Sequence, residues 1–247
     1  MIDIKTSEEI QTMREGGKIL AGIIQKIGKM AKPGIATKEL DRAAEALILK
    51  HGAKPSFKGH NGFPASLCVS VNEEIVHMIP SDRVLKEGDI VSLDLGLLYK
   101  GFHLDMAITV AIGKVSKKAK ELIKITKEAL DFIIKKVKPG VSTNEIGGLV
   151  ENFIEKNGFG AVRELCGHGI GKNLHENPQI PNYKDVGQGE ILKEGMTVCL
   201  EPMATVGDWR IKKAKDGYGF QTKDSSLAAH FEHTIAITKK GAVVITK

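Results

Sequence analysis

The hydrophobic and polar positions of the chain follow a helical period in two pairs of segments. Ser7 to Met30 and Lys117 to Val137 each predict a helix, and each segment runs into a Lys-Pro-Gly sequence, where proline and glycine break a helix. A second helix is expected after each break, capped by Thr37 in one case and by Thr143 in the other. The apolar positions of these second helices recur on one helix face: Leu40, Ala44, Leu47 and Ile48, then Ile146, Val150, Phe153 and Ile154.

Strands are predicted downstream of each helix pair, where β-branched residues gather. The runs are Val69-Ser70-Val71, Ile90-Val91-Ser92-Leu93 and Thr197-Val198-Cys199-Leu200. Two short sequences also repeat in the same order along the chain. Residues 32–40 recur as residues 138–146, at an offset of 106, and the Leu-Lys-Glu-Gly sequence at 85–88 recurs at 192–195, at an offset of 107. Two repeats in nearly the same register predict an internally duplicated protein.

The duplication predicts an α+β fold in which two related halves share an antiparallel sheet, with the helices on one face. We expect a single domain over residues 1–247, with halves of approximately 1–110 and 111–247. Alignment of the repeats places Asp94 opposite Glu201, so each half supplies a carboxylate from the same structural position. The place where two such halves meet is a common location for a functional site.

Composition narrows the class of protein. The 247 residues are 42% hydrophobic and 27% charged, which excludes a disordered or collagen-like chain. No apolar run reaches the roughly 20 residues of a membrane span, and the N-terminus lacks the features of a signal peptide, so we expect a cytoplasmic protein without a membrane partner. Three widely spaced cysteines (Cys68, Cys166 and Cys199) do not form a disulfide framework or a zinc-finger pattern. The net charge of +6 is spread along the chain and does not itself indicate nucleic-acid binding.

The first candidate chemistry is a pair of carboxylates on one predicted hairpin. Asp94 lies in an apolar strand, and Asp105 follows eleven residues later. A turn at Tyr99-Lys100 would make the two aspartates direct cross-strand neighbours, whereas a turn at Lys100-Gly101 would make them diagonal neighbours. Two like charges so close are unfavourable unless a cation lies between them or one is protonated. The alternative is that one aspartate simply faces solvent, since hairpins often have one exposed face.

Three further residues extend this set. His168 lies between glycines that allow close backbone approach to an ion, Glu201 follows an apolar strand, and Glu232 begins an alternating strand. A histidine in a loop is more often solvated than ligating, and a glutamate at a strand end often marks only the exit to solvent. Taken together, four carboxylates and one imidazole suit Mn, Fe, Co or Zn, and four negative charges suit two divalent ions about 3.5–4 Å apart.

These motifs resemble those of type I methionine aminopeptidases over essentially the whole chain. The resemblance rests on Asp94 with Asp105, Gly-His168-Gly-Ile-Gly, His175-Glu-Asn-Pro, Glu201-Pro-Met and Glu232-His-Thr-Ile. It implies the pita-bread fold, whose two halves are related by a pseudo-twofold axis. It also implies an enzyme that removes the initiator methionine of nascent proteins when the second residue is small, by attack of a metal-activated water on the scissile amide.

The resemblance further implies roles for individual residues. Two divalent ions (Co, Mn, Fe, Ni or Zn) would be held by Asp94, Asp105, His168, Glu201 and Glu232. His77 and His175 would contact the substrate, and Glu201 would also move the proton from water to the leaving amine. Phe63 and Cys68 would line the pocket for the methionine side chain. The implied partners are the N-terminal peptide of nascent proteins and the ribosome, and the enzyme is expected to be a monomer.

The chain also departs from the family pattern. Met78 stands where glycine is usual and is expected to narrow the cleft, His60 and Phe63 stand where tyrosines are common, and Leu174 and Tyr218 replace bulkier aromatics.

Some alternatives stay open. Without the family pattern, His77 between Val76 and Met78 also fits a buried core histidine. An Xaa-Pro aminopeptidase of the same fold would share all five ligands, although such enzymes usually carry a further N-terminal domain. A non-catalytic module that binds nascent chains or RNA would be expected to lose ligands.

Overall fold

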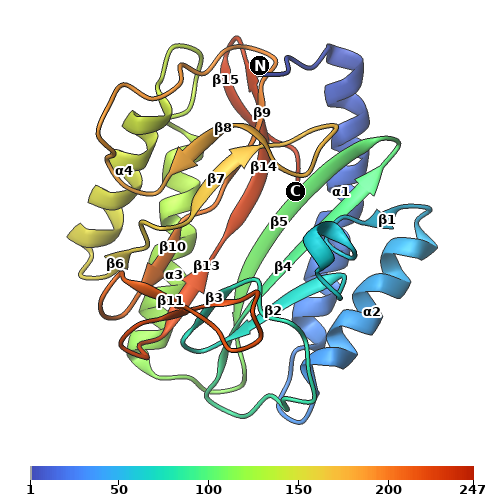
Figure 1. The fold of residues 1–247 in the computed structure, drawn as a ribbon, viewed down its shortest axis with the longest axis vertical. Helices are drawn as coiled ribbons and strands as arrows, with labels where there is room; N and C mark the ends of the chain where they lie inside the picture. The colour runs from blue at the N-terminus through green and yellow to red at the C-terminus, as the bar shows by residue number, and fades with distance from the viewer. Residues whose placement is uncertain (1) are drawn as a thin grey trace.

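A computed structural model describes residues 2–247 of the protein (Figure 1). Its helices occur in two consecutive pairs that frame the strands: α1 (Ser7–Met30), α2 (Thr37–Lys50), α3 (Lys117–Ile134) and α4 (Thr143–Lys156). The predicted span of α1 is confirmed, whereas α3 ends three residues before Val137, with Lys135 as its C-terminal cap. In each half, therefore, a long helix precedes a shorter one, as the periodicity predicts.

The predicted caps of α2 and α4 are wrong by one residue. The cap of α4 is Ser142, whose hydroxyl accepts a hydrogen bond from the Glu145 amide at 3.1 Å. Ala36 occupies the cap position of α2, and its amide donates to the Glu39 carboxylate at 2.9 Å. Thr37 is instead the first helical residue, and its hydroxyl contacts a neighbouring loop. A serine next to a threonine offers two capping hydroxyls, and the backbone conformation decides which one is used.

The central feature is a nine-stranded sheet with the order β1–β4–β5–β14–β9–β7–β8, in which β2 also pairs with β4 and β15 with β14. All of these pairings are antiparallel. The strands of this sheet are β1 (Lys54–Pro55), β2 (Leu67–Val71), β4 (Ile90–Tyr99), β5 (Phe102–Ala111), β7 (Cys166–Gly169), β8 (Glu176–Pro181), β9 (Thr197–Leu200), β14 (Glu232–Thr238) and β15 (Gly241–Val244).

Two smaller antiparallel sheets complete the fold. One has the order β13–β10–β6 and the other β11–β12–β3. Their strands are β3 (Glu74–Val76), β6 (Gly160–Ala161), β10 (Met203–Thr205), β11 (Ile211–Lys213), β12 (Phe220–Thr222) and β13 (Ala228–His230). The antiparallel α+β architecture expected from the sequence is therefore confirmed.

The helix pairs divide between the two parts of the sheet. In Figure 1, α1 lies beside β4 and β5 and α2 lies beside β1 and β2, while α3 and α4 lie beside the strands of the later half of the chain. Leu20 and Ile24 of α1 are buried in one apolar cluster, and Leu122 of α3 and Ile146 of α4 are buried in another. No helix within residues 2–247 is long and apolar enough to cross a bilayer.

The repeated sequences make equivalent contacts in both halves. The Gly34 amide donates to the Leu85 carbonyl at 2.9 Å, and the Gly140 amide donates to the Leu192 carbonyl at the same distance. Isolated bridges join Ala36 to Val84 and residue 142 to residue 191, which are again equivalent pairs. In each half, then, the segment after the first helix packs against the Leu-Lys-Glu-Gly turn that precedes the site-bearing strand.

Candidate active site

The hairpin of β4 and β5 holds the two candidate aspartates. The chain turns at Lys100 and Gly101, whose φ values are 48° and 88°, a positive-φ pair that matches the twist of a two-residue hairpin. Asp94 is consequently opposite Ala107, and Asp105 is its diagonal neighbour. Of the two turns considered from the sequence, the one at Lys100-Gly101 is therefore correct, and it still brings both aspartates to one place.

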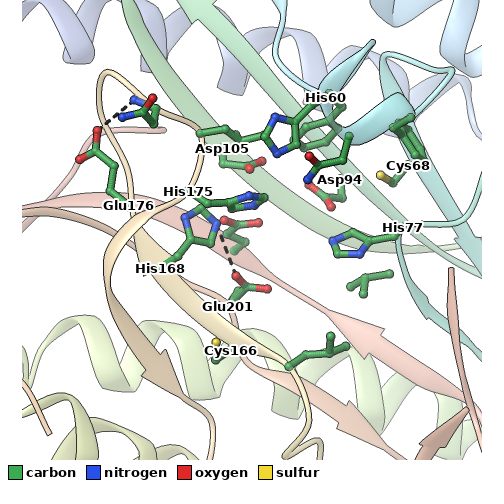
Figure 2. A pocket seen from close by; sticks show the side chains of 18 of the residues that line it. His60, Cys68, His77, Asp94, Asp105, Cys166, His168, His175, Glu176 and Glu201 are labelled. Carbon is green, nitrogen blue, oxygen red and sulfur yellow. Dashed lines mark hydrogen bonds and ion pairs between the residues drawn. The ribbon is translucent and has the colours of Figure 1, made fainter. Parts of the chain in front are cut away.

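The later half of the chain brings the remaining carboxylates to the same place. Glu232, the first residue of β14, pairs with Ala107, so it lies across β5 from Asp94. Glu201 directly follows β9, which pairs with β14. His168 belongs to β7, which pairs with β9, and its Nε2 atom lies 3.7 Å from Glu201 Oε1. All five residues predicted as metal ligands thus converge from five segments of the sheet. Figure 2 labels four of them, Asp94, Asp105, His168 and Glu201.

The carboxylate oxygens of the site lie close together and are shielded from solvent. One oxygen each from Asp94, Asp105 and Glu232 lie within 4.8 Å of one another. These residues are 7%, 4% and 3% exposed, respectively. Within the part of the chain that the structure describes, no lysine or arginine forms an ion pair with any of them, and Asp94 Oδ1 and Glu232 Oε1 have no hydrogen-bond partner. Three buried carboxylates with the partly buried Glu201 beside them are strongly unfavourable when no positive charge is near, because an isolated buried charge loses its hydration without compensation.

The electrostatics of the site reflect this crowding. Burial raises the pKa of Asp94 to about 7. The pKa of Asp105 is raised well above its usual range, first by burial and then by the neighbouring charge of Glu232. Burial, followed by the nearby carboxylates, likewise raises the pKa values of Glu201 and Glu232. Bound divalent cations would stabilise the ionised carboxylates and so lower these pKa values. A set of oxygen donors with one imidazole fits Mn, Fe, Co, Ni or Zn.

The carboxylates form the floor of a cavity of about 820 Å³. His77 and His175 reach into this cavity from its sides, as Figure 2 shows. Both histidines are exposed to it, so the alternative interpretation of His77 as a buried core histidine is wrong. His77 has a φ of 59°, a region that a residue with a Cβ atom rarely adopts and that is enriched at functional sites. The ring of His175 meets that of His168 edge to face, with centroids 4.5 Å apart.

The predicted pocket residues line one wall of the same cavity. Phe63 contacts the edge of Tyr218, with ring centroids 5.6 Å apart, and Cys68 is buried on β2 directly opposite Asp94. His60 and Leu174 also line the cavity. Together with Phe57, these residues make a largely apolar wall next to the carboxylates.

Met78 does not narrow the cleft as the sequence suggests. It is absent from the cavity lining within residues 2–247, and its thioether packs against Gly219, where an added Cβ atom would collide with the sulfur. The missing side chain of Gly219 therefore provides the space that Met78 fills, outside the cavity.

One buried residue of the site was missed by the sequence interpretation. His230 is 1% exposed, and its Nε2 atom lies 3.6 Å from Glu201 Oε2 and 3.9 Å from Glu232 Oε2. A signal for it exists in the sequence, because residues two apart in an extended segment face the same side, and His230 precedes Glu232 by two.

Comparison with known proteins agrees with the site. Residues 11–239 match the model of metallopeptidase family M24. The chain belongs to this family. Methionine aminopeptidase 1 of Bacillus subtilis is 47% identical over the full length of both chains, which confirms the resemblance found in the sequence.

Solved structures of M24 peptidases show the same fold. The crystal structure of methionine aminopeptidase from Thermotoga maritima is 43% identical, with a TM-score of 0.97 and full coverage of both chains. The Xaa-Pro dipeptidase from Bacillus anthracis is 28% identical, with a TM-score of 0.80, and the match covers 99% of this chain but 62% of that one. The pita-bread fold is common to both kinds of M24 peptidase, so the fold prediction is confirmed and the sequence identities favour the first kind.

Proposed function

We propose that this M24 metallopeptidase is a methionine aminopeptidase that removes the N-terminal methionine of nascent proteins whose second residue is small. The observation that carries the proposal is the cluster of buried carboxylates, without a lysine or arginine partner among residues 2–247, that opens onto an apolar-walled cavity. The full-length similarity to methionine aminopeptidases supports the same activity. The competing Xaa-Pro activity has weaker support, because the Xaa-Pro dipeptidase is less similar to this chain. A non-catalytic module would have no use for the complete carboxylate set.

The residues that would hold two divalent ions are Asp94, Asp105, His168, Glu201 and Glu232. When bound, such ions make a water molecule nucleophilic near neutral pH and polarise the scissile carbonyl. Bound cations would neutralise the buried carboxylates. Asp94 and Glu232 each have a buried oxygen without a hydrogen-bond partner among residues 2–247, and these oxygens would bind the ions. The identity of the metal does not follow from this donor set, since Co, Mn, Fe, Ni and Zn all accept it.

The protein's own groups then have separate tasks. Glu201 borders both the carboxylate cluster and the open cavity, so its carboxylate accepts a proton from the attacking water and passes it to the leaving amine. His77 and His175 stand on opposite sides of the cavity and donate hydrogen bonds to the substrate amide as it becomes tetrahedral. The free α-amine of the substrate lies against the carboxylate end.

The apolar wall determines the specificity. Phe63, Cys68 and Leu174 offer aromatic, thiol and aliphatic contacts to an unbranched, polarizable methionine side chain. The residue after the methionine must fit in the remaining space beside the histidines. An apolar pocket discriminates by about 1–3 kcal/mol per methylene, so activity should decline gradually as this second residue becomes larger.

A peptide series tests the proposal. The purified protein, loaded with Mn²⁺ or Co²⁺, is assayed on Met-X-Ser peptides in which X runs from Gly and Ala to Leu and Phe, with an Ala-Pro peptide in parallel. We expect release of methionine that falls from Met-Ala-Ser to Met-Phe-Ser. Equal cleavage of these two peptides would contradict the specificity. A preference for the Ala-Pro peptide would support the Xaa-Pro activity instead, and absence of any cleavage would support the binding module.

The proposal also covers the oligomeric state, the cellular location and the partners of the enzyme. It would act as a monomer in the cytoplasm, on peptides that emerge from the ribosome, and the net charge of +6 is compatible with an approach to ribosomal RNA. We also propose that residues 1–247 form one catalytic domain, with halves of about 1–110 and 111–247 that arose by duplication. The equivalent hydrogen bonds at Gly34 and Gly140 support this origin.

A further inference from the structure

The buried imidazole ring of His230 has no hydrogen bond within residues 2–247 that explains its position. Neither of its ring nitrogens has a hydrogen-bond partner among residues 2–247, although the residue is 1% exposed. Its backbone is held firmly, because its amide donates to Thr109 Oγ1 at 2.9 Å and its carbonyl accepts from the same hydroxyl at 2.8 Å. A fixed, buried imidazole with two unpaired nitrogens is costly, so its partner is expected to be something that binds between the side chains.

The distances from His230 Nε2 to Glu201 and Glu232, 3.6 Å and 3.9 Å, are close to those between ligands of one metal ion. Two donors bound at about 2.0–2.2 Å to one ion lie roughly 3.0–3.6 Å apart. His230 Nε2 lies 3.6 Å from Glu201 Oε2, too far for a good hydrogen bond. On the other side of the same carboxylate, His168 Nε2 lies 3.7 Å from Oε1. The two imidazoles thus flank Glu201 at nearly equal distances, and one donor atom each from Glu201, His230 and Glu232 lie within 4.8 Å of one another.

We propose that His230 is a sixth protein ligand of the metal centre, a second imidazole that binds a divalent ion together with Glu201 and Glu232. This inference rests on the metal centre of the proposed function and adds a nitrogen donor to it. A neutral imidazole has one ring nitrogen with a free lone pair, which is the atom that binds a divalent ion. A second imidazole shifts the preference of the centre away from Mn²⁺ and toward Co²⁺, Ni²⁺ or Zn²⁺, which favour nitrogen donors.

X-ray absorption spectroscopy of the Zn²⁺-loaded protein tests the proposal directly, because scattering from imidazole carbons counts bound histidines without an activity assay. The wild-type protein is expected to show two bound imidazoles per chain, and His230→Gln one. The matched control His51→Gln removes an exposed histidine at the end of α2 and should keep two. Calorimetric titration should show at least a ten-fold loss of Zn²⁺ affinity at one site in His230→Gln, and a smaller loss of Mn²⁺ affinity.

The outcomes separate this inference from the proposed function. If the wild-type protein binds two ions with a single imidazole, the assignment of His230 is wrong and the five-residue centre stands. If the wild-type protein binds no divalent ion, the metal centre of the proposed function fails as a whole. The imidazole count of the wild-type protein needs no substitution, so a His230→Gln protein that does not fold would leave the test intact. Circular dichroism of each metal-free variant monitors folding.

Discussion

Replacement of Lys5 by methionine should destabilise the protein and impair the active-site loop at the same time. Lys5 Nζ lies 2.5 Å from Glu176 Oε2, and the two side chains are 1% and 10% exposed. Glu176 directly follows His175, and its other oxygen accepts a hydrogen bond from the Asn173 amide at 2.9 Å. The ion pair therefore connects the N-terminal segment to the loop that presents His175 to the cavity.

The size of the effect follows from the burial of the pair. Removing one partner of a buried ion pair costs about 3–5 kcal/mol, because the other charge stays buried without compensation. Methionine preserves most of the apolar stem of Lys5, and Glu176 keeps its backbone hydrogen bond, so we expect a loss near 3 kcal/mol. For a chain of this length, each kcal/mol lowers Tm by about 2–4 °C, which gives a decrease of about 6–12 °C.

Thermal unfolding and kinetics measure both consequences. The matched control is Lys127→Met, because Lys127 pairs with Asp131 at 2.9 Å on the surface, where the side chains are 60% and 47% exposed. That variant should lose no more than about 0.5 kcal/mol. Lys5→Met should also lower kcat on Met-Ala-Ser several-fold, and Lys5→Met/Glu176→Gln should regain part of the lost stability. Equal Tm decreases for Lys5→Met and Lys127→Met would refute the reasoning.

The remaining predictions concern the catalytic groups. Exhaustive chelation should abolish peptidase activity and lower Tm, and Mn²⁺ or Co²⁺ should restore both; full turnover by protein shown to be metal-free by elemental analysis would contradict the proposed centre. Glu201→Gln should reduce kcat by about 10²–10⁴-fold while KM changes little, since it removes the proton acceptor but keeps the shape; a kcat near the wild-type value would limit Glu201 to a structural role. His77→Ala and His175→Ala should each lower kcat without loss of bound metal, and metal loss measured in either variant would assign that histidine to the metal centre instead.

Local patterns in the sequence predict most of the helical framework and the carboxylate set. The period of apolar residues and the Lys-Pro-Gly breaks define α1 correctly because both effects act over a few residues. The aspartates of the hairpin could also be placed together, since either turn keeps Asp94 and Asp105 within two positions of each other. His168, Glu201 and Glu232 could be named as candidates from their glycine and strand contexts, and the resemblance to a known family then supplied their common role as ligands.

Features that depend on contacts between distant segments could not be predicted. The thioether of Met78 leaves the cavity because Gly219, far along the chain, has no side chain at that place. The Lys5–Glu176 pair joins residues 171 positions apart. The spacing of His230 and Glu232 gives a local signal, but the approach of His230 to Glu201 depends on where β13 ends, a relation between strands of different sheets. In each case the missing information is three-dimensional proximity, and residue type does not encode it.

The register between β5 and β14 determines whether the carboxylates of the two halves of the chain lie together. Ala107 on β5 pairs with Asp94 on β4 and with Glu232 on β14. The side chains of Asp94, Ala107 and Glu232 therefore share one face of the sheet. A slip of one residue would turn Glu232 to the opposite face and separate it from the aspartates. Thr234 opposes such a slip, because its hydroxyl donates to the Asp105 carbonyl at 2.8 Å and accepts from the Asp105 amide at 3.0 Å. A buried threonine on β14 thus fixes the position of a carboxylate on β5, and the two halves of the chain meet in the one register that assembles the acidic centre.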